Sequence, residues 1–147
     1  MSNGLRVRAA TESDAEALAR LSGQLGYPAD AAAIEQRLRA IAEADAGVVL
    51  AAVSADGSVS GFVQVVPQHF LIAAPFAELA ALVVDEQARG ARVGAALLGA
   101  AERWARERGF ATMRVRSNVI RERAHRFYLR EGYAEVKRQA VFSKQLG

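Results

Sequence analysis

The apolar residues of this chain alternate with polar ones at its start and then recur with a helical period. Residues 5–10 alternate, which is typical of a half-buried strand. Thr11-Glu12-Ser13-Asp14 has the composition of a capping box and Gly26-Tyr27-Pro28 is a stop signal, so a helix is predicted between them. A second helix is predicted from Asp30 to Ala44, because its large apolar residues fall on one face.

Three strands are predicted in the middle of the chain. Residues 48–54 and 59–66 are joined by Asp56-Gly57, a dipeptide that favours a tight antiparallel hairpin. Pro67 is expected to interrupt the second of these strands. A further strand over residues 77–84 is apolar on both faces, which indicates a central, buried position in the sheet.

The second half of the chain predicts a crossover. The period is helical from Val93 to the stop at Gly109, and residues 111–116 then resemble a strand, so the two flanking strands should be parallel. A last helix is expected over residues 121–131 and a last strand over residues 133–144. The expected fold class is α/β (α+β), with a mixed sheet of about six to seven strands and helices on both faces.

Composition limits the chain to one core and excludes several kinds of site. With 147 residues, of which 52% are hydrophobic, a single domain over residues 1–147 is expected. The chain has no cysteine, which excludes disulfides, thiolate metal ligands and a cysteine nucleophile. Its two histidines are far apart without acidic ligands nearby, so no metal is predicted. Because it shows neither a signal segment nor a membrane-spanning run, we expect a cytoplasmic protein without a membrane partner.

The charge gives little support to a nucleic-acid partner. The formal net charge is +3, and most of the basic excess lies between Arg89 and Arg138. Arginines and glutamates are mixed on the helix in this region, which is typical of a solvated face. A strand surface combining aromatic and basic residues is also missing. A basic nucleic-acid-binding domain is therefore the weakest of the hypotheses, and no nucleic-acid partner is expected.

A glycine-containing loop leaves the central strand and opens the following helix. Unpaired backbone N–H groups and the helix dipole make such a turn favourable for a phosphate. Gly90 permits an unusual backbone angle, and Arg89 and Arg92 add positive charge. The spacing is neither that of a dinucleotide fold nor that of a Walker loop. Taken alone, a tight turn with solvated arginines explains it equally well.

The segment from Arg89 to Leu98, preceded by Leu82-Val83-Val84, resembles the acetyl-CoA motif of the GNAT superfamily of N-acetyltransferases. The family pattern is (Gln/Arg)-x-x-Gly-x-(Gly/Ala); Arg89 and Gly94 match its ends, whereas Arg92 stands where the middle glycine is usual. The likeness continues at Asn118 and through His125–Tyr133. Together with the order of elements it covers nearly the whole chain.

The resemblance implies acetyl-CoA as co-substrate and residues that hold it. Leu82 and Val84, with Val83 between them, would offer main-chain hydrogen bonds to the pantetheine arm, as an added strand does. Asn118 would bond near the thiol end, although a cap of the next helix is nearly as good an interpretation. The pyrophosphate would lie on the loop, whose residues are Arg89, Gly90, Ala91, Arg92, Val93, Gly94 and Ala95.

Two catalytic residues follow from the same resemblance. In related enzymes a tyrosine at the place of Tyr128 protonates the departing thiolate, although a phenol with a pKa of about 10 can instead donate only a hydrogen bond. Glu78 stands where some members carry a general base, which is needed because the attacking amine must be neutral. By spacing alone Tyr128 is a core aromatic, and Glu78 is solvated if it faces water. His69 is a second candidate for the base.

The acceptor site is expected near Tyr27, His69 and Phe70. The stretch from Arg114 to Tyr133 is similar to acetyltransferases of aminoalkylphosphonates and aminoglycosides, which implies a small-molecule amine and direct attack in a ternary complex. Amines of peptides or proteins stay open as acceptors, as does a non-catalytic acyl-CoA-binding module, against which Glu78 and Tyr128 argue. The apolar C-terminal strand offers a surface for a homodimer.

Overall fold

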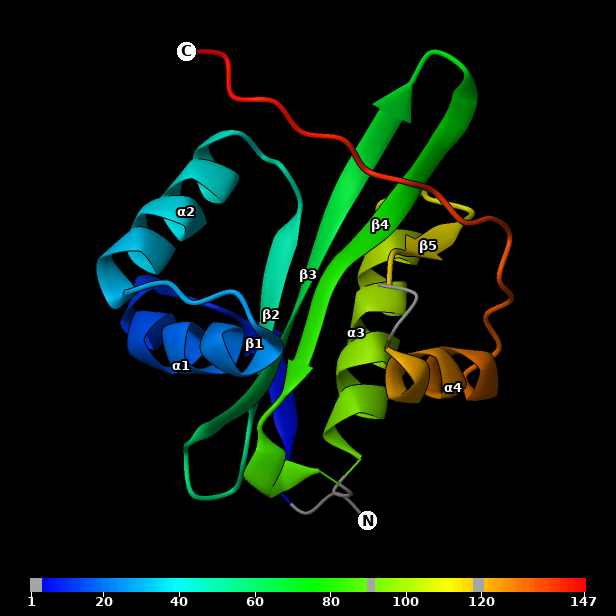
Figure 1. The fold of residues 1–147 in the computed structure, drawn as a ribbon. Coiled ribbons are helices and arrows are strands. Elements are labelled where there is room, and N and C mark those ends of the chain that lie inside the picture. Colours follow the sequence, from blue (N-terminus) through cyan, green and yellow to red (C-terminus); the bar gives the residue numbers. More distant parts are fainter. Residues whose placement is uncertain (1–3, 90–91, 118–120) are drawn as a thin grey trace. The chain divides into compact units, whose positions relative to one another are not determined.

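The computed structural model describes residues 4–89, 92–117 and 121–147 (Figure 1). The chain divides into two compact units, residues 1–116 and 117–147, and each is described by itself. The larger unit holds, in chain order, β1 (Arg6–Ala9), the short 3-10 helix η1 (Glu12–Asp14), α1 (Ala15–Leu25), α2 (Ala31–Glu43), β2 (Val48–Val53), β3 (Val59–Phe70), β4 (Ala73–Val84), the 3-10 helix η2 (Glu86–Ala88), α3 (Val93–Glu107) and β5 (Met113–Val115). The smaller unit holds α4 (Glu122–Arg130). The single domain expected from the sequence stays a prediction.

The sheet is mixed, as predicted. Its order is β1-β2-β3-β4-β5; the first three pairs are antiparallel, and β4 pairs parallel with β5. Figure 1 shows α1 and α2 on one face of the sheet and α3 on the other. The parallel pair confirms the crossover through α3 that the change of hydrophobic period indicated.

The strand count was predicted too high, because the described residues form five strands. The expected strand over residues 133–144 does not form, and residues 133–147 contain neither helix nor strand. A strand forms only where a neighbour supplies its hydrogen bonds, and this segment pairs with no strand among the described residues.

The predicted break at Pro67 is also wrong, because β3 continues through it to Phe70 and forms a long hairpin with β4. The carbonyl of Ser60 accepts a hydrogen bond from the N–H of Asp85, so every second residue from Ser60 directs its backbone groups to β4. Pro67 has the opposite parity and lies beyond the last β2 pair, Val48 with Val65. Its missing N–H therefore interrupts no ladder.

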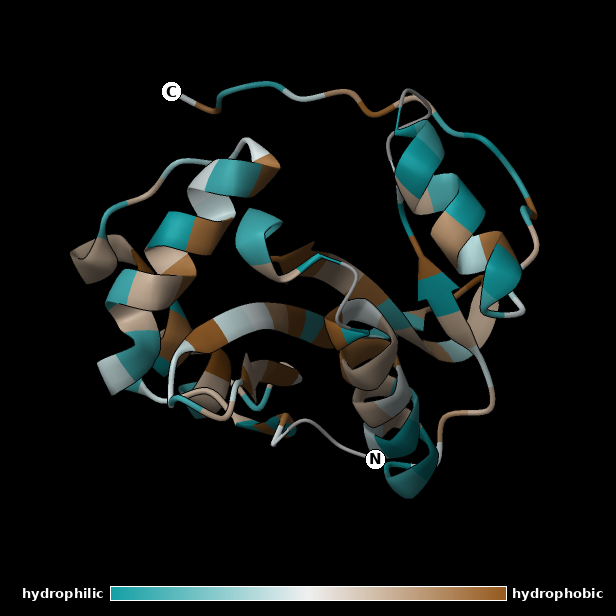
Figure 2. Ribbon diagram, turned by 90° about the horizontal axis from the view of Figure 1, so that it is seen from below, coloured by the Kyte–Doolittle hydropathy of each residue, from teal (hydrophilic) through white to brown (hydrophobic). Residues whose placement is uncertain are grey.

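Hydrophobic side chains fill both faces of the sheet, and Figure 2 shows brown, hydrophobic segments concentrated along its strands. On the α1 face a buried cluster joins Leu21 to Val83 and neighbouring strand residues. On the α3 face, Gly61 lies so close to the helix that an added Cβ would meet Leu97 at 3.0 Å and the carbonyl of Val83 at 2.6 Å. This close approach sets the first turns of α3 against the carboxyl-terminal half of β4.

A charged pair connects β1 to the start of α1. Arg8 donates to both carboxylate oxygens of Asp14, at 2.8 and 3.0 Å, and the N–H of Thr11 donates to the same carboxylate at 2.8 Å. The Asp14 side chain is 6% exposed. The hydrogen bonds from Arg8 lower the pKa of Asp14 below its ordinary value. This is the capping box expected at Thr11, and its acid, Asp14, also accepts hydrogen bonds from Arg8.

Asp14→Asn should lower the free energy of unfolding at neutral pH by about 2 kcal/mol, because hydrogen bonds to a charged group are lost from a buried site. Because the pKa of Asp14 is lower in the folded state than in the unfolded state, its carboxylate stabilises the fold fully at pH values above the unfolded pKa. This stabilisation is lost as the pH falls through the folded pKa. The difference between wild type and variant should therefore shrink below about pH 4. Urea unfolding at neutral pH and below about pH 4 measures this difference in the free energy of unfolding. Asp45→Asn is the control, since the Arg108–Asp45 pair is exposed. Equal losses in the two variants would contradict the account.

Candidate active site

The central strand β4 loses its β5 neighbour halfway along its length. Parallel pairing runs from Ala77 with Met113 to Leu79 with Val115 and ends there. On the other side, Gln64 pairs with Ala81 and Val65 with Leu79, so Ala80 is an extra, bulged residue. From Ala80 to Val84 no described strand covers the β5 side of β4. The result is an open strand edge inside the sheet.

Backbone parity shows which residues face this edge. Because the N–H of Asp85 donates to Ser60 on β3 at 2.8 Å, Asp85 and Val83 direct their backbone groups toward β3. Leu82 and Val84 therefore direct theirs toward the open edge, as the sequence predicted for two of its cofactor residues. Val83 lies between them and anchors the strand with a buried side chain.

The end of β4 is fixed to α1 by polar contacts. Arg20 donates to the Asp85 carboxylate at 2.7 Å, and Gln24 accepts from the N–H of Glu86 at 3.1 Å. Asp85 also accepts from the N–H of Gln87, and this bond, followed by the one from Arg20, lowers the pKa of Asp85. The start of the loop toward α3 is thereby held in one position.

The first turn of α3 has no side-chain cap from Arg92 and is flanked by positive charge. The N-cap residue Arg92 makes no side-chain capping bond, so the N–H groups of the first turn lack that partner. Val93 is buried and fixes the turn, Gly94 is half-buried, and Arg89 and Arg92 are exposed. Ala95 follows Gly94 within the helix. Two predicted residues of the loop, Gly90 and Ala91, lie outside the described residues.

Arg92 has a left-handed backbone, with φ 63°. A side chain in this region costs about 1 to 2 kcal/mol relative to ordinary helical geometry. The sequence showed Arg92 where the family usually has glycine, and the left-handed backbone is the conformation that glycine adopts most easily. The loop keeps the glycine-type conformation while bearing an arginine.

Glu78 is buried on β4, two residues before the bulge, with 9% of its surface exposed. Its carboxylate accepts a hydrogen bond from Nε of Arg116 at 2.9 Å. Glu78 lies opposite Arg114 in the parallel register, and the Arg114 guanidinium lies 4.3 Å from the centre of the Phe76 ring. Glu78 is therefore no solvated residue at the start of the strand, which was the alternative interpretation.

The two neighbours on β3 point to opposite faces. The ring of His69 lies 6.3 Å from that of Phe110, which in turn stacks with Trp104 of α3. Phe70 instead contacts Phe76 at 5.8 Å, on the face that carries Glu78. Phe70 therefore lies on the same face of the sheet as Glu78, and His69 lies on the other face. Tyr27 follows the end of α1 and is 66% exposed.

The unit of residues 117–147 carries Tyr128 on α4. Its ring packs edge-on against Tyr133 at 5.9 Å, and its carbonyl accepts from the N–H of Tyr133 at 2.9 Å. Burial raises the pKa of Tyr128 to about 12, because it penalises the phenolate. The phenol is thus a donor of hydrogen bonds at neutral pH. Asn118, the other predicted residue of this unit, lies outside the described residues.

A family model for the acetyltransferase (GNAT) family matches residues 14–133, and these include the open edge of β4, the start of α3 and Tyr128. This chain belongs to the GNAT acetyltransferase family. The resemblance inferred from the loop and from the aromatic helix is confirmed.

Relatives of this acetyltransferase act on small amines according to their names. The chain is 33% identical to aminoglycoside N(6')-acetyltransferase type 1 of Stenotrophomonas maltophilia, over 95% of this chain and 93% of that protein. It is 40% identical to the aminoalkylphosphonate N-acetyltransferase of Salmonella typhimurium over 81 residues, which are 54% of this chain and 53% of that protein.

Solved structures show the same fold. The aminoglycoside N-acetyltransferase AAC(6')-Iy in complex with CoA matches with a TM-score of 0.85 and 21% identity, over 96% of this chain and 95% of that one. The enzyme AAC(6')-Ih from Acinetobacter baumannii matches with a TM-score of 0.84 and 18% identity, over 98% and 100% of the two chains.

Sequence reasoning missed two arginines of the candidate site, Arg114 and Arg116. Both lie at the end of the strand that follows the crossover, and both contact side chains of β4. A signal was present in the alternation Arg114-Val115-Arg116, because alternate residues of a strand share a face. The register with β4, which the sequence does not give, was needed to see that this face carries Glu78.

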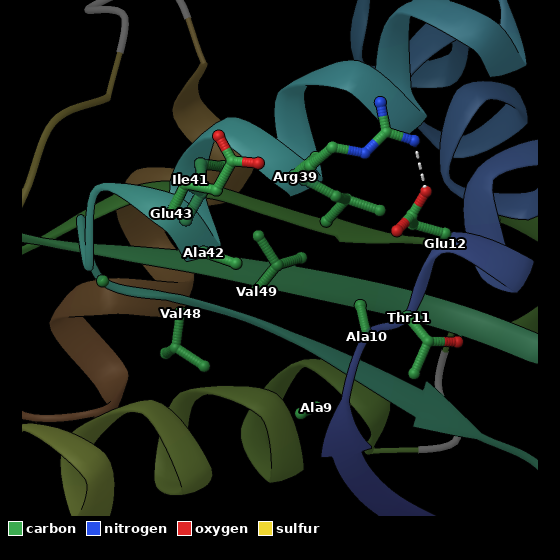
Figure 3. Close-up of a pocket in the computed structure, with 12 residues that line it drawn as sticks. Ala9, Ala10, Thr11, Glu12, Arg39, Ile41, Ala42, Glu43, Val48 and Val49 are labelled. Carbon is green, nitrogen blue, oxygen red and sulfur yellow. Dashed lines mark hydrogen bonds and ion pairs between the residues drawn. The ribbon is translucent and has the colours of Figure 1, made fainter.

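A pocket of about 380 Å³ elsewhere on the acetyltransferase lies between α2 and the strands β1 and β2 (Figure 3). It is mostly apolar, with the ion pair of Arg39 and Glu12 at 2.7 Å on its rim. None of the predicted site residues lines it. Among the described residues, no cluster of histidine and acidic side chains is suited to a metal ion, and no helix is long and apolar enough to span a membrane.

Proposed function

We propose that this acetyltransferase uses acetyl-CoA and transfers the acetyl group to a primary amine of a small molecule. The observation that carries the proposal is the open edge of β4, which runs from the bulge at Ala80 toward the end of the strand that α3 packs against. The edge offers strand hydrogen bonds and begins two residues after Glu78, and the first turn of α3 packs near its far end.

The residues present fit acetyl-CoA. Leu82 and Val84 can pair with the amide groups of the pantetheine arm, because their backbone groups face the open edge. The first turn of α3, with Arg89 and Arg92, can hold the pyrophosphate. When bound, acetyl-CoA supplies a thioester whose acetyl group is already activated for transfer. Coenzyme A complexes of structural relatives support this assignment.

Glu78 is assigned as the base. The acceptor arrives as an ammonium ion, and the carboxylate takes one proton, directly or through water, to leave a neutral nucleophile. The amine nitrogen then forms a bond with the carbonyl carbon, and the bond from that carbon to sulfur breaks. Tyr128 donates a hydrogen bond to the departing sulfur, which is the role that suits a phenol with a pKa of about 12. The second proton of the amine leaves to solvent.

A small molecule is the preferred acceptor, because the two named relatives act on aminoglycosides and aminoalkylphosphonates. Thiol release from acetyl-CoA, measured across small amines and peptides, tests the proposal. Release with a small amine and none with peptides is expected. Release with peptides alone would move the function to protein acetylation, and binding without release would leave an acyl-CoA-binding module. The cytoplasmic location stays a prediction.

Tyr128→Phe should lower kcat about tenfold to a hundredfold, while the Kd for acetyl-CoA changes little, because only a hydrogen bond to the leaving group is lost. Below about pH 10 the pH profile should keep its shape in both enzymes, since burial keeps the wild-type phenol protonated there. Single-turnover kinetics measures this, with Tyr133→Phe as an aromatic control. Unchanged turnover would remove Tyr128 from the mechanism.

A further inference from the structure

Four side chains gather where β4 and β5 pair in parallel: Phe76 and Glu78 from β4, Arg114 from β5, and Arg116, which directly follows β5. We call them the arginine cluster. They lie on one face of the sheet because residues two apart on a strand share a face and Glu78 lies opposite Arg114. The cluster contains two guanidinium groups and one carboxylate, so its net charge is positive.

Arg116 holds Glu78 through one nitrogen only. Nε of Arg116 donates to the carboxylate at 2.9 Å, and the Arg116 side chain is 55% exposed whereas that of Glu78 is 12% exposed. In this contact the two terminal nitrogens of the guanidinium are not used by Glu78. A planar guanidinium can donate from them to a second anion while it keeps its bond to the first.

Arg114 is positioned by an aromatic ring rather than by an acid. Its guanidinium lies 4.3 Å from the centre of the Phe76 ring, and Phe76 itself is buried, with 2% of its surface exposed. Among the described contacts of Arg114, none is with a carboxylate. Arg114 thus presents a preoriented positive charge on the face that carries the proposed base.

We propose that the acceptor is a primary amine bearing an anionic group, a carboxylate or a phosphonate, a few bonds from its nitrogen. This inference rests on the proposed function of Glu78. The ammonium end faces Glu78, and the anionic end faces the donors of Arg116 and the charge of Arg114. Arg116 keeps its Nε bond to Glu78 while its terminal nitrogens bind the anion, so neither Glu78 nor Arg116 is left unpaired.

A polycationic amine fits this cluster poorly. Glu78 is the carboxylate within the cluster and already has a guanidinium partner, so a second ammonium group would face unbalanced positive charge. At about 4 Å, like charges in a partly desolvated site repel by several kcal/mol. The cluster therefore discriminates by charge, and discrimination of this kind weakens with ionic strength.

The test compares acceptors of similar length: β-alanine and aminoethylphosphonate with an anionic end, propylamine with none, and diaminopropane with a second cation. For at least one anionic amine, kcat/KM should exceed that for propylamine about tenfold or more and that for diaminopropane by a larger factor, with KM rising as salt is added. Preference for propylamine or diaminopropane would overturn the inference and leave the acetyltransferase function intact. No release with any amine would instead overturn the proposed function on which it rests.

Charge reversal tests the role of Arg114 directly. Arg114→Glu should lower kcat/KM for the anionic amine about a hundredfold and raise it for diaminopropane, whereas Arg114→Lys should retain most of the preference. Arg106→Glu on the exposed face of α3 is the matched control. It should change kcat/KM neither for the anionic amine nor for diaminopropane. Thermal unfolding verifies that each variant is folded. An equal loss for all three acceptor types in Arg114→Glu would contradict a role in charge recognition.

Discussion

Glu78→Gln is expected to lower kcat/KM about a thousandfold at neutral pH, because the acceptor then has no base to take its proton. The deficit should shrink as pH rises toward about 10, where the amine loses its proton to solvent. Glutamine keeps the shape of the buried side chain and can still accept the hydrogen bond from Arg116, so the fold should be retained.

The pH–rate profile of Glu78→Gln measures this expectation. Glu16→Gln, on the exposed side of α1, is the matched control and should follow the wild type throughout. A profile for Glu78→Gln with the height and shape of the wild type would exclude Glu78 as the base. A loss that is the same at every pH would assign it to positioning rather than proton transfer.

Gly94→Gln should raise the Kd for acetyl-CoA about a hundredfold or more, because a side chain in the first turn of α3 occupies the space that a pyrophosphate needs beside the N–H groups. Glycine is a poor helix former, so the substitution should leave the helix intact or stabilise it by up to about 1 kcal/mol. Loss of binding would then not reflect unfolding.

Gly99→Gln supplies the matched control for this substitution. Gly99 lies on the same helix, and a Cβ added there meets nothing within 4 Å. Its binding of acetyl-CoA should equal that of the wild type in equilibrium titrations. Full binding by Gly94→Gln would contradict the phosphate-loop assignment, and equal losses in both variants would point to a general effect on α3.

The sequence predicted well those elements whose signals are local. Helix α2 begins where Asp30 accepts from the N–H of Ala33 at 2.8 Å, and α1 ends at Gly26 in a left-handed conformation, as caps and stop signals indicated. Glu78 could be singled out through the resemblance to the family, because some members carry a general base at this place.

The structural predictions that failed concerned positions whose structure depends on neighbours distant in sequence. Pro67 is a break signal only where its missing N–H would face another strand, and β2 ends before it. Residues 133–144 were predicted as a strand, yet they form no strand among the described residues. Arg116 became part of the candidate site only through a register that pairs β5 with β4. Such pairings are tertiary facts, which local patterns do not encode.

Calorimetric titration of the protein with acetyl-CoA tests the central claim most directly. We predict one site per chain, with binding that is lost in Gly94→Gln and retained in Gly99→Gln. The absence of binding by the wild type would contradict the assignment of the open β4 edge and the start of α3 to this co-substrate.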